Sequence, residues 1–118
     1  MVDPSATAGK PEVPFETFAA LDLRSARVVR AEAHPNAEKL LVLTIDLGEL
    51  GERQIVAGIA KQHAPETLVG RTIIVAANLK PVRLRGVESR GMLLAMQAGE
   101  AVVLLTGAGE VPPGTAVS

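Results

Sequence analysis

The sequence contains no cysteine, and this absence removes several kinds of chemistry at once. Without a thiol there is no disulfide, no thiolate nucleophile and no cysteine-ligated metal site, so we expect no redox chemistry. Tryptophan and tyrosine are missing too, and the two phenylalanines, Phe15 and Phe18, stand near the beginning of the chain. The rest of the sequence therefore offers no aromatic ring for stacking against a planar ligand.

Long apolar runs are also missing. Apolar residues make up 47% of the chain, but they occur in short blocks, whereas a helix that spans a bilayer needs about 20 in succession. The first residues show no basic region followed by an apolar one, so no secretory signal is visible. We expect a soluble, cytoplasmic protein that has no membrane partner.

Catalytic and cofactor motifs are not recognisable. The two histidines, His34 and His63, lie outside any nucleophile motif and have no second ligand at metal-binding spacing, so we assign them structural or surface roles. Neither a glycine-rich dinucleotide fingerprint nor a P-loop occurs. The sequence therefore predicts a non-catalytic protein without cofactor or metal.

The chain of 118 residues suits one domain. Residues 1–14 are rich in proline and small residues and have no apolar period, which is typical of a flexible tail or linker. Residues 15–118 form the expected domain. Phe15 and Phe18, three positions apart behind Pro14, predict one helical turn laid on that domain.

Alternating apolar residues predict a series of short β-strands. The most regular run has one apolar face, formed by Leu41, Leu43, Ile45 and Leu47. In residues 21–33 the apolar positions change parity, which predicts a bulge near Ser25–Ala26. Further strands are expected at residues 54–57, 71–77, 92–96 and 102–105, with a helical turn at residues 65–68. This pattern favours an all-β, closed or nearly closed small barrel, with a β-sandwich as the alternative.

Positive charge is unevenly distributed, although the net charge is only −1. Residues 1–70 contain seven Lys and Arg against ten Asp and Glu, whereas residues 71–118 contain five against three. Most cations of the second part share one short window; they are Lys80, Arg83, Arg85 and Arg90, with the single acid Glu88 among them. A local excess of positive charge is what phosphate binding requires.

The segment from Asn78 to Met92 is therefore the main candidate site. The alternation of residues 82–85 predicts an extended strand with Arg83 and Arg85 on one face. Guanidinium groups suit phosphate oxygens, and Asn78 and Ser89 offer hydrogen bonds to phosphate, ribose or a base edge. On composition alone, the competing interpretation is an ordinary solvated hairpin face.

A resemblance to a known family decides between these interpretations. The matching strings, in chain order, are Asp22-Leu23-Arg24, His34-Pro35-Asn36-Ala37-Glu38-Lys39-Leu40, Arg53-Gln54-Ile55-Val56-Ala57-Gly58-Ile59-Ala60, Leu68-Val69-Gly70, Asn78-Leu79-Lys80-Pro81 and Gly86-Val87-Glu88-Ser89-Arg90-Gly91-Met92. From residue 15 to 118 the chain resembles the tRNA-binding domain family, which occurs at the carboxyl end of many bacterial methionyl-tRNA synthetases and as free-standing tRNA-binding proteins. The resemblance implies a five-stranded OB-fold barrel with short helical insertions and a C-terminal extension. It also implies a homodimer that holds the outer corner of tRNA with little regard to sequence.

The resemblance further implies which residues contact RNA. These are Asn78, Lys80, Arg83, Ser89 and Met92, with Lys39 and Arg27 as flanking candidates; Arg85 and Arg90 are added here from their charge. His34, Pro35 and Leu40 are expected to fix a turn and the core. Ser25-Ala26 departs from the family pattern, in which Val-Gly is common. Because aromatic rings are scarce, we expect readout of folded tRNA rather than of single strands.

Two other functions fit the same fold. Secretion chaperones of this family hold unfolded proteins, but they diverge around residues 78–81, and the match here favours RNA. The third function is dimerisation alone, with the basic segment idle. For the RNA-binding function, the partners implied are tRNA and the catalytic region of methionyl-tRNA synthetase. Both a free-standing protein and the end of a synthetase are compatible with this.

Overall fold

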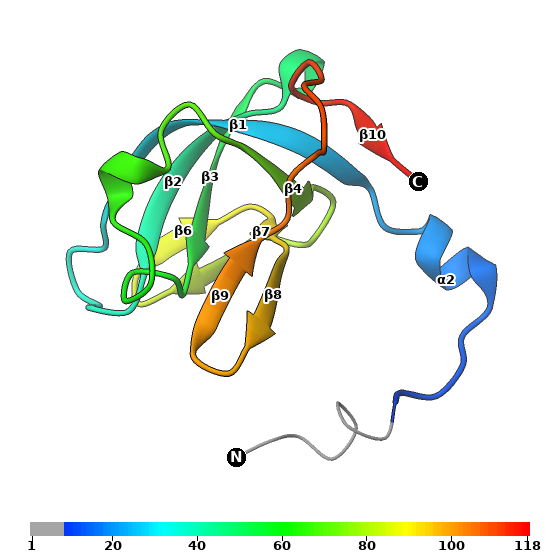
Figure 1. Cartoon of the computed structure of the whole chain (residues 1–118), viewed down its shortest axis with the longest axis horizontal. Helices are drawn as coiled ribbons and strands as arrows, with labels where there is room; N and C mark the ends of the chain where they lie inside the picture. The colour runs from blue at the N-terminus through cyan, green and yellow to red at the C-terminus, as the bar shows by residue number, and fades with distance from the viewer. Residues whose placement is uncertain (1–8) are drawn as a thin grey trace.

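The computed structural model describes residues 9–118 and shows a strongly curved β-sheet with a protruding hairpin (Figure 1). In chain order the elements are α2 (Phe15–Ala19), β1 (Leu23–Ala33), β2 (Leu41–Asp46), the 3₁₀ helix η1 (Gly48–Leu50), β3 (Glu52–Ala57), the 3₁₀ helix η2 (Pro65–Thr67), β4 (Thr72–Ala76), β5 (Val82–Leu84), β6 (Val87–Ser89), β7 (Met92–Leu93), β8 (Ala95–Ala98), β9 (Ala101–Leu104) and β10 (Ala116–Val117). The expected tail falls partly outside the described residues, and residues 9–14 contain no helix or strand.

Strand β1 connects the two halves of the barrel. Its first part, from Leu23 to Arg27, pairs with β4, and its second part, from Arg27 to Ala33, pairs with β2. The register shifts between Val28 and Arg30, so the bulge lies at Val29. The expected bulge near Ser25–Ala26 is wrong, because the register of β1 with β4 is unbroken from Leu23 to Arg27.

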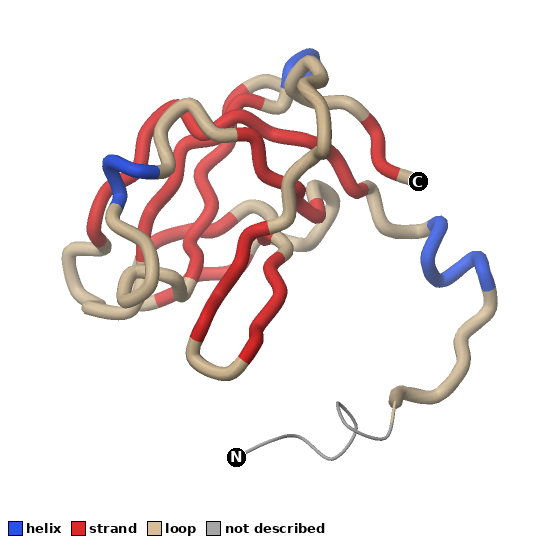
Figure 2. The backbone as a smooth tube through the Cα atoms, in the orientation of Figure 1, coloured by secondary structure: helices blue, strands red, loops and turns tan. Residues whose placement is uncertain are grey.

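The strands follow the order β3-β2-β1-β4-β7, with β10 beside β1. Figure 2 shows how this sheet curls. The ends approach each other where the backbone N–H of Arg90 donates to the carbonyl oxygen of Gln54 in β3, at 2.9 Å. The next residue is Gly91, where a Cβ would lie 2.9 Å from the carbonyl oxygen of Ala76 in β4 and the φ is +122°, so a side chain would be strained there. The result is a nearly closed five-stranded barrel, and the predicted all-β fold class is confirmed.

The barrel core is built around β2. The predicted apolar face is confirmed, because Leu41, Leu43, Ile45 and Leu47 are each at most 1% exposed. They pack with buried residues of β3, β4 and the β3–β4 connection, which include Ile55, Leu68, Ile73 and Val75. Each such side chain contributes about 1.5–3 kcal/mol when it is fully buried. The interior of the barrel is thus a packed apolar core.

The C-terminal extension begins after β7. The strand expected at residues 92–96 is divided into β7 and β8, and β8 pairs with β9 in a separate two-stranded sheet. After this hairpin the chain returns to β1, where the hydroxyl of Ser25 donates to the carbonyl oxygen of Pro112 and accepts from the N–H of Thr115, both at 3.0 Å. The buried Ser25 hydroxyl therefore holds the extension in place.

Helix α2 stands away from the barrel (Figure 1). The predicted helical turn is confirmed, and the rings of Phe15 and Phe18 lie 6.0 Å apart between centroids. The expectation that this turn packs on the domain is wrong, because no residue of α2 is buried and Phe15 is 75% exposed. The other expected helical turn is found as η2. Within residues 9–118, no helix is long and apolar enough to cross a membrane.

Candidate nucleic-acid interface

Strands β5 and β6 form a tight hairpin at the centre of the basic segment. Leu84 pairs with Val87, so the loop consists of Arg85 and Gly86 alone. Both loop residues have positive φ, +52° and +89°, which is the geometry of a type I′ turn. The expected common face of Arg83 and Arg85 is wrong, because the extended strand ends at Leu84 and Arg85 lies in the turn. The two guanidinium groups therefore leave the hairpin from different parts of it.

The hairpin is docked on the turn between β1 and β2. The Nε2 of His34 donates to the carbonyl oxygen of Leu84 at 2.9 Å, while its Nδ1 accepts the backbone N–H of Asn36 at 2.9 Å. This pair of bonds fixes the ring tautomer, since Nδ1 must be unprotonated to accept. Arg85 adds a bond from Nη2 to the carbonyl oxygen of Asn36 at 3.2 Å. The predicted structural role of His34 is confirmed, and it extends to the hairpin.

The other end of the hairpin is fixed on β3. Ser89 is 1% exposed; its hydroxyl accepts the backbone N–H of Val56 at 2.9 Å and donates to the carbonyl oxygen of Gly91 at 3.0 Å. The side-chain amide of Gln54 donates to the carbonyl oxygen of Glu88 at 2.8 Å. The Ser89 hydroxyl is buried and makes both of these hydrogen bonds within the protein, so in this structure it supports the hairpin.

Asn78 joins two chain segments at the entrance to the hairpin. Its Oδ1 accepts the backbone N–H of Asp22 and its Nδ2 donates to the carbonyl oxygen of Ala20, both at 2.8 Å. The amide is exposed, but each of its ends is already engaged with backbone. Asn78 therefore sets the path of the chain into residues 79–81 and ties it to the beginning of β1.

The four cations of the segment are all exposed. Within residues 9–118, Lys80 and Arg90 make no side-chain hydrogen bond or ion pair, and Arg83 bonds only the carbonyl oxygen of Gly86, at 2.8 Å. Glu88 lies opposite Arg83 in the strand register without forming an ion pair with it. None of these four cations forms an ion pair with an acidic side chain of residues 9–118.

A hollow of about 620 Å³ lies where the hairpin meets the β1–β2 turn. Residues 36–40 and Arg85 line it, so the structure brings together two of the predicted site residues, Lys39 and Arg85. Glu38 is the acid of this lining. The hollow extends the cationic surface of the hairpin onto the neighbouring turn.

Two predicted residues lie outside this cluster. Met92 is half-buried at the start of β7, where it pairs with Ala76. Arg27 lies in the middle of β1, opposite Thr72 at the beginning of β4, whereas Asn78 follows the end of β4. Six residues of extended chain correspond to roughly 20 Å, so Arg27 belongs to another part of the surface. Residues 9–118 contain no group of three His, Asp or Glu side chains at metal-binding distances.

Comparison with known proteins gives this geometry a family context. A model of the putative tRNA-binding domain matches residues 23–116. The methionine–tRNA ligase of Thermotoga maritima is 54% identical over 106 residues, which make up 90% of this chain and 17% of that protein. The ligase of Methanothrix thermoacetophila is 54% identical over 108 residues, or 92% of this chain and 16% of that protein. The chain thus spans about a sixth of the length of these curated relatives.

Two solved structures share the fold over their whole length. The MetRS related protein from Pyrococcus horikoshii superposes with a TM-score of 0.85 at 36% identity, covering 92% of this chain and 100% of that one. The chaperone CsaA from Bacillus anthracis superposes with a TM-score of 0.82 at 38% identity, with the same coverage. These two structures are about equally similar to this chain, but one is named a chaperone and the other a MetRS related protein. Similarity alone therefore does not choose between the two functions, and the chemistry of the site has to do so.

Proposed function

The chain belongs to the tRNA-binding domain family, and we propose that its β5–β6 hairpin, with the β1–β2 turn, binds the sugar–phosphate backbone of folded tRNA. The observation that carries this proposal is the set of exposed cations that the hairpin holds without an acidic partner among residues 9–118. The module is non-catalytic in this proposal. It acts in the cytoplasm as the C-terminal domain or an accessory subunit of methionyl-tRNA synthetase and raises the local concentration of tRNA.

The hairpin provides contacts to phosphate rather than readout of bases. Lys80, Arg83, Arg85 and Arg90 are donors only, and the guanidinium fork suits phosphate oxygens. Stacking on single-stranded bases needs aromatic rings, but both phenylalanines lie on α2 and outside the hairpin. With about three to five phosphate contacts, the affinity should fall with salt by roughly 0.7–0.9 logarithmic units per contact.

The decisive experiment reverses two charges of the hairpin. Lys80→Glu with Arg83→Glu should weaken tRNA binding by about tenfold or more at low salt, because two contacts become repulsive. Both side chains are exposed and hold no other secondary-structure element, so the barrel should stay folded. The matched control, Arg30→Glu with Lys61→Glu, changes the net charge equally on exposed residues outside the hairpin. Equal binding by the two double variants in a gel-shift titration would remove this site.

We further propose a homodimer that uses the apolar hollow beside α2. This hollow, of about 530 Å³, is lined mainly by apolar side chains that include Phe18, Leu23, Ile74, Leu105 and Val117. A second copy seated there would also cover Phe15, and two hairpins acting on one tRNA would strengthen weak single-site binding. Phe15→Ser with Phe18→Ser removes no core residue and should give a folded monomer in sedimentation experiments. A variant that still sediments as a dimer would contradict this interface.

The second candidate function is the binding of unfolded polypeptide, and the similarity to the chaperone CsaA favours it together with the same apolar hollow. The two functions use different surfaces, so one competition experiment separates them. If tRNA is the ligand, an unfolded polypeptide does not displace it and the hairpin variant loses tRNA alone. Recovery of unfolded polypeptide without tRNA in a pull-down would reverse the ranking. A dimer that sediments identically with and without tRNA at low salt would leave dimerisation as the only function.

A further inference from the structure

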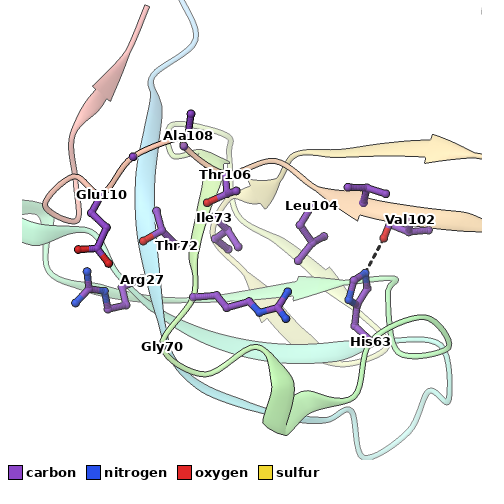
Figure 3. A pocket seen from close by; sticks show the side chains of 14 residues that line it. Arg27, His63, Gly70, Thr72, Ile73, Val102, Leu104, Thr106, Ala108 and Glu110 are labelled. Carbon is purple, nitrogen blue, oxygen red and sulfur yellow. Dashed lines mark hydrogen bonds between the residues drawn. The ribbon is translucent and has the colours of Figure 1, made fainter.

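We propose that a second groove, on the part of the barrel remote from the β5–β6 hairpin, binds a phosphate-bearing ligand. The groove has a volume of about 780 Å³ and lies between the middle of β1, the beginning of β4 and the loop of residues 106–110 (Figure 3). It contains Arg27, which the structure separates from the hairpin, and Arg71 next to the start of β4. The sequence provides no motif for this site because its parts are far apart along the chain.

Two arginines give the groove its positive charge. Arg27 and Arg71 are exposed and make no side-chain hydrogen bond or ion pair with any residue of the described part of the chain. Glu110 is the acid of the lining and extends toward Arg27 in Figure 3, but the two do not form an ion pair. The lining holds two guanidinium groups against one carboxylate, and guanidinium groups without acceptors are suited to phosphate oxygens.

The loop of residues 106–110 forms part of the lining of the groove. None of its N–H groups donates to a protein acceptor within residues 9–118. The loop is folded tightly at Gly107, where a Cβ would lie 2.9 Å from the carbonyl oxygen of Gly109. The hydroxyls of Thr72 and Thr106 also line the groove and make no hydrogen bond with the described residues. Two guanidinium groups, two hydroxyls and a loop with N–H groups unpaired within residues 9–118 thus share one lining, and hydrogen-bond donors are the groups that bind oxyanions.

The floor of the groove is held by the barrel. Figure 3 shows His63 below Val102, to whose carbonyl oxygen its Nε2 donates at 2.7 Å. This bond ties the β3–β4 connection to β9, and Ile73 and Leu104 provide apolar lining between the polar groups. The volume lies in the range of about 300–1,000 Å³ that is usual for small-molecule sites. A concave site of this size fits one phosphorylated molecule, or a single protruding phosphate of an RNA, better than the side of a duplex.

The first experiment uses inorganic pyrophosphate as the probe, with the chain in the oligomeric state that it has in solution. Pyrophosphate should shift the amide resonances of Gly107 and Gly109 in a saturable titration at low salt. Arg27→Gln with Arg71→Gln should weaken this binding by about tenfold or more, because the charge-assisted bonds are lost. The control, Arg30→Gln with Lys61→Gln, removes equal charge and should bind as the parent does. Absence of saturable shifts in residues 106–110, or equal binding by the two double variants, would overturn the proposal.

A second measurement identifies the source of the phosphate, and this arm alone rests on the proposed tRNA function. If a tRNA phosphate enters the groove, the Arg27 and Arg71 variant should lower the salt slope of tRNA binding by roughly 0.7–0.9 per lost contact, and pyrophosphate should compete. If the ligand is a separate small molecule, tRNA binding should stay unchanged while pyrophosphate binding is lost. Both outcomes support the groove. Failure of the hairpin variant to affect tRNA would reject the proposed function and leave the pyrophosphate result standing.

Discussion

The β5–β6 and β8–β9 hairpins are built alike but carry different side chains. Each forms a two-stranded sheet of its own, and each accepts a histidine hydrogen bond at a backbone carbonyl, Leu84 from His34 and Val102 from His63. Residues 82–89 hold two cations and one acid, with Lys80 and Arg90 just outside them, whereas residues 95–104 hold one acid and no cation. A histidine thus holds each hairpin through a backbone carbonyl, and this contact does not depend on the exposed side chains, which are free to differ.

The two histidines give the largest expected difference between the hairpins. His34 is 5% exposed and uses both ring nitrogens, so His34→Ala should lower the free energy of unfolding by about 2–4 kcal/mol through lost bonds and a cavity. His63 is half-buried and makes one bond, so His63→Ala should cost about 0.5–1.5 kcal/mol. Urea denaturation of both variants measures this difference.

The tRNA affinity of the same two variants is a second test of the comparison. Where His34→Ala is still folded, its tRNA affinity should fall, because the cationic hairpin loses its attachment to the β1–β2 turn. His63→Ala leaves the basic hairpin attached to the β1–β2 turn and should lower tRNA affinity less than His34→Ala does. Equal stability losses in the two variants would show that both hairpins are docked with the same strength, and the comparison drawn from burial would then fail.

Ser89 tests whether residues of the basic hairpin support it or contact RNA. In Ser89→Ala the buried N–H of Val56 loses its acceptor, so the free energy of unfolding should fall by about 1–3 kcal/mol. The tRNA affinity of the folded variant should fall no more than it does in His34→Ala, because both changes loosen the hairpin without removing a contact to RNA. Ser25→Ala is a matched control, since that buried hydroxyl holds the C-terminal extension instead. A Ser89→Ala variant with full stability and weakened tRNA binding would establish a direct contact and contradict the structural role.

Local sequence patterns predict an element correctly where a single physical rule determines its structure. The alternation of Leu41 to Leu47 identified the core strand, because a period of two can only place those residues on one face. Pro65 and the pair of phenylalanines identified short helical turns for the same local reason. Local charge also located the basic hairpin, since exposure of lysine and arginine is the rule on protein surfaces.

Long-range contacts and backbone reversals were not predictable from the same patterns. The bond from His34 to Leu84 spans 50 positions and has no local signal. Arg83 and Arg85 are two positions apart, as residues on one face of a strand would be. The strand ends at Leu84, however, and the turn at Arg85 places that side chain off the face of Arg83. Arg27 was assigned to the RNA site by resemblance, and only the register of β1 with β4 shows its distance from the hairpin. Even so, the resemblance to the family was confirmed by the match to residues 23–116.

A substitution at Arg85 has the smallest expected effect of these tests. It is also the most specific, because we expect it to raise stability and lower tRNA affinity at the same time. A type I′ turn favours Asn-Gly, and a non-glycine residue at φ +52° is strained unless its side chain suits the left-handed region. Arg85→Asn should therefore raise the free energy of unfolding by about 0.5–1 kcal/mol, despite loss of the exposed bond to Asn36. The same variant should bind tRNA a few times more weakly, with a salt slope lower by about 0.7–0.9. A loss of stability would show that the bond to Asn36 outweighs the strain, so that Arg85 serves the hairpin before it serves the ligand.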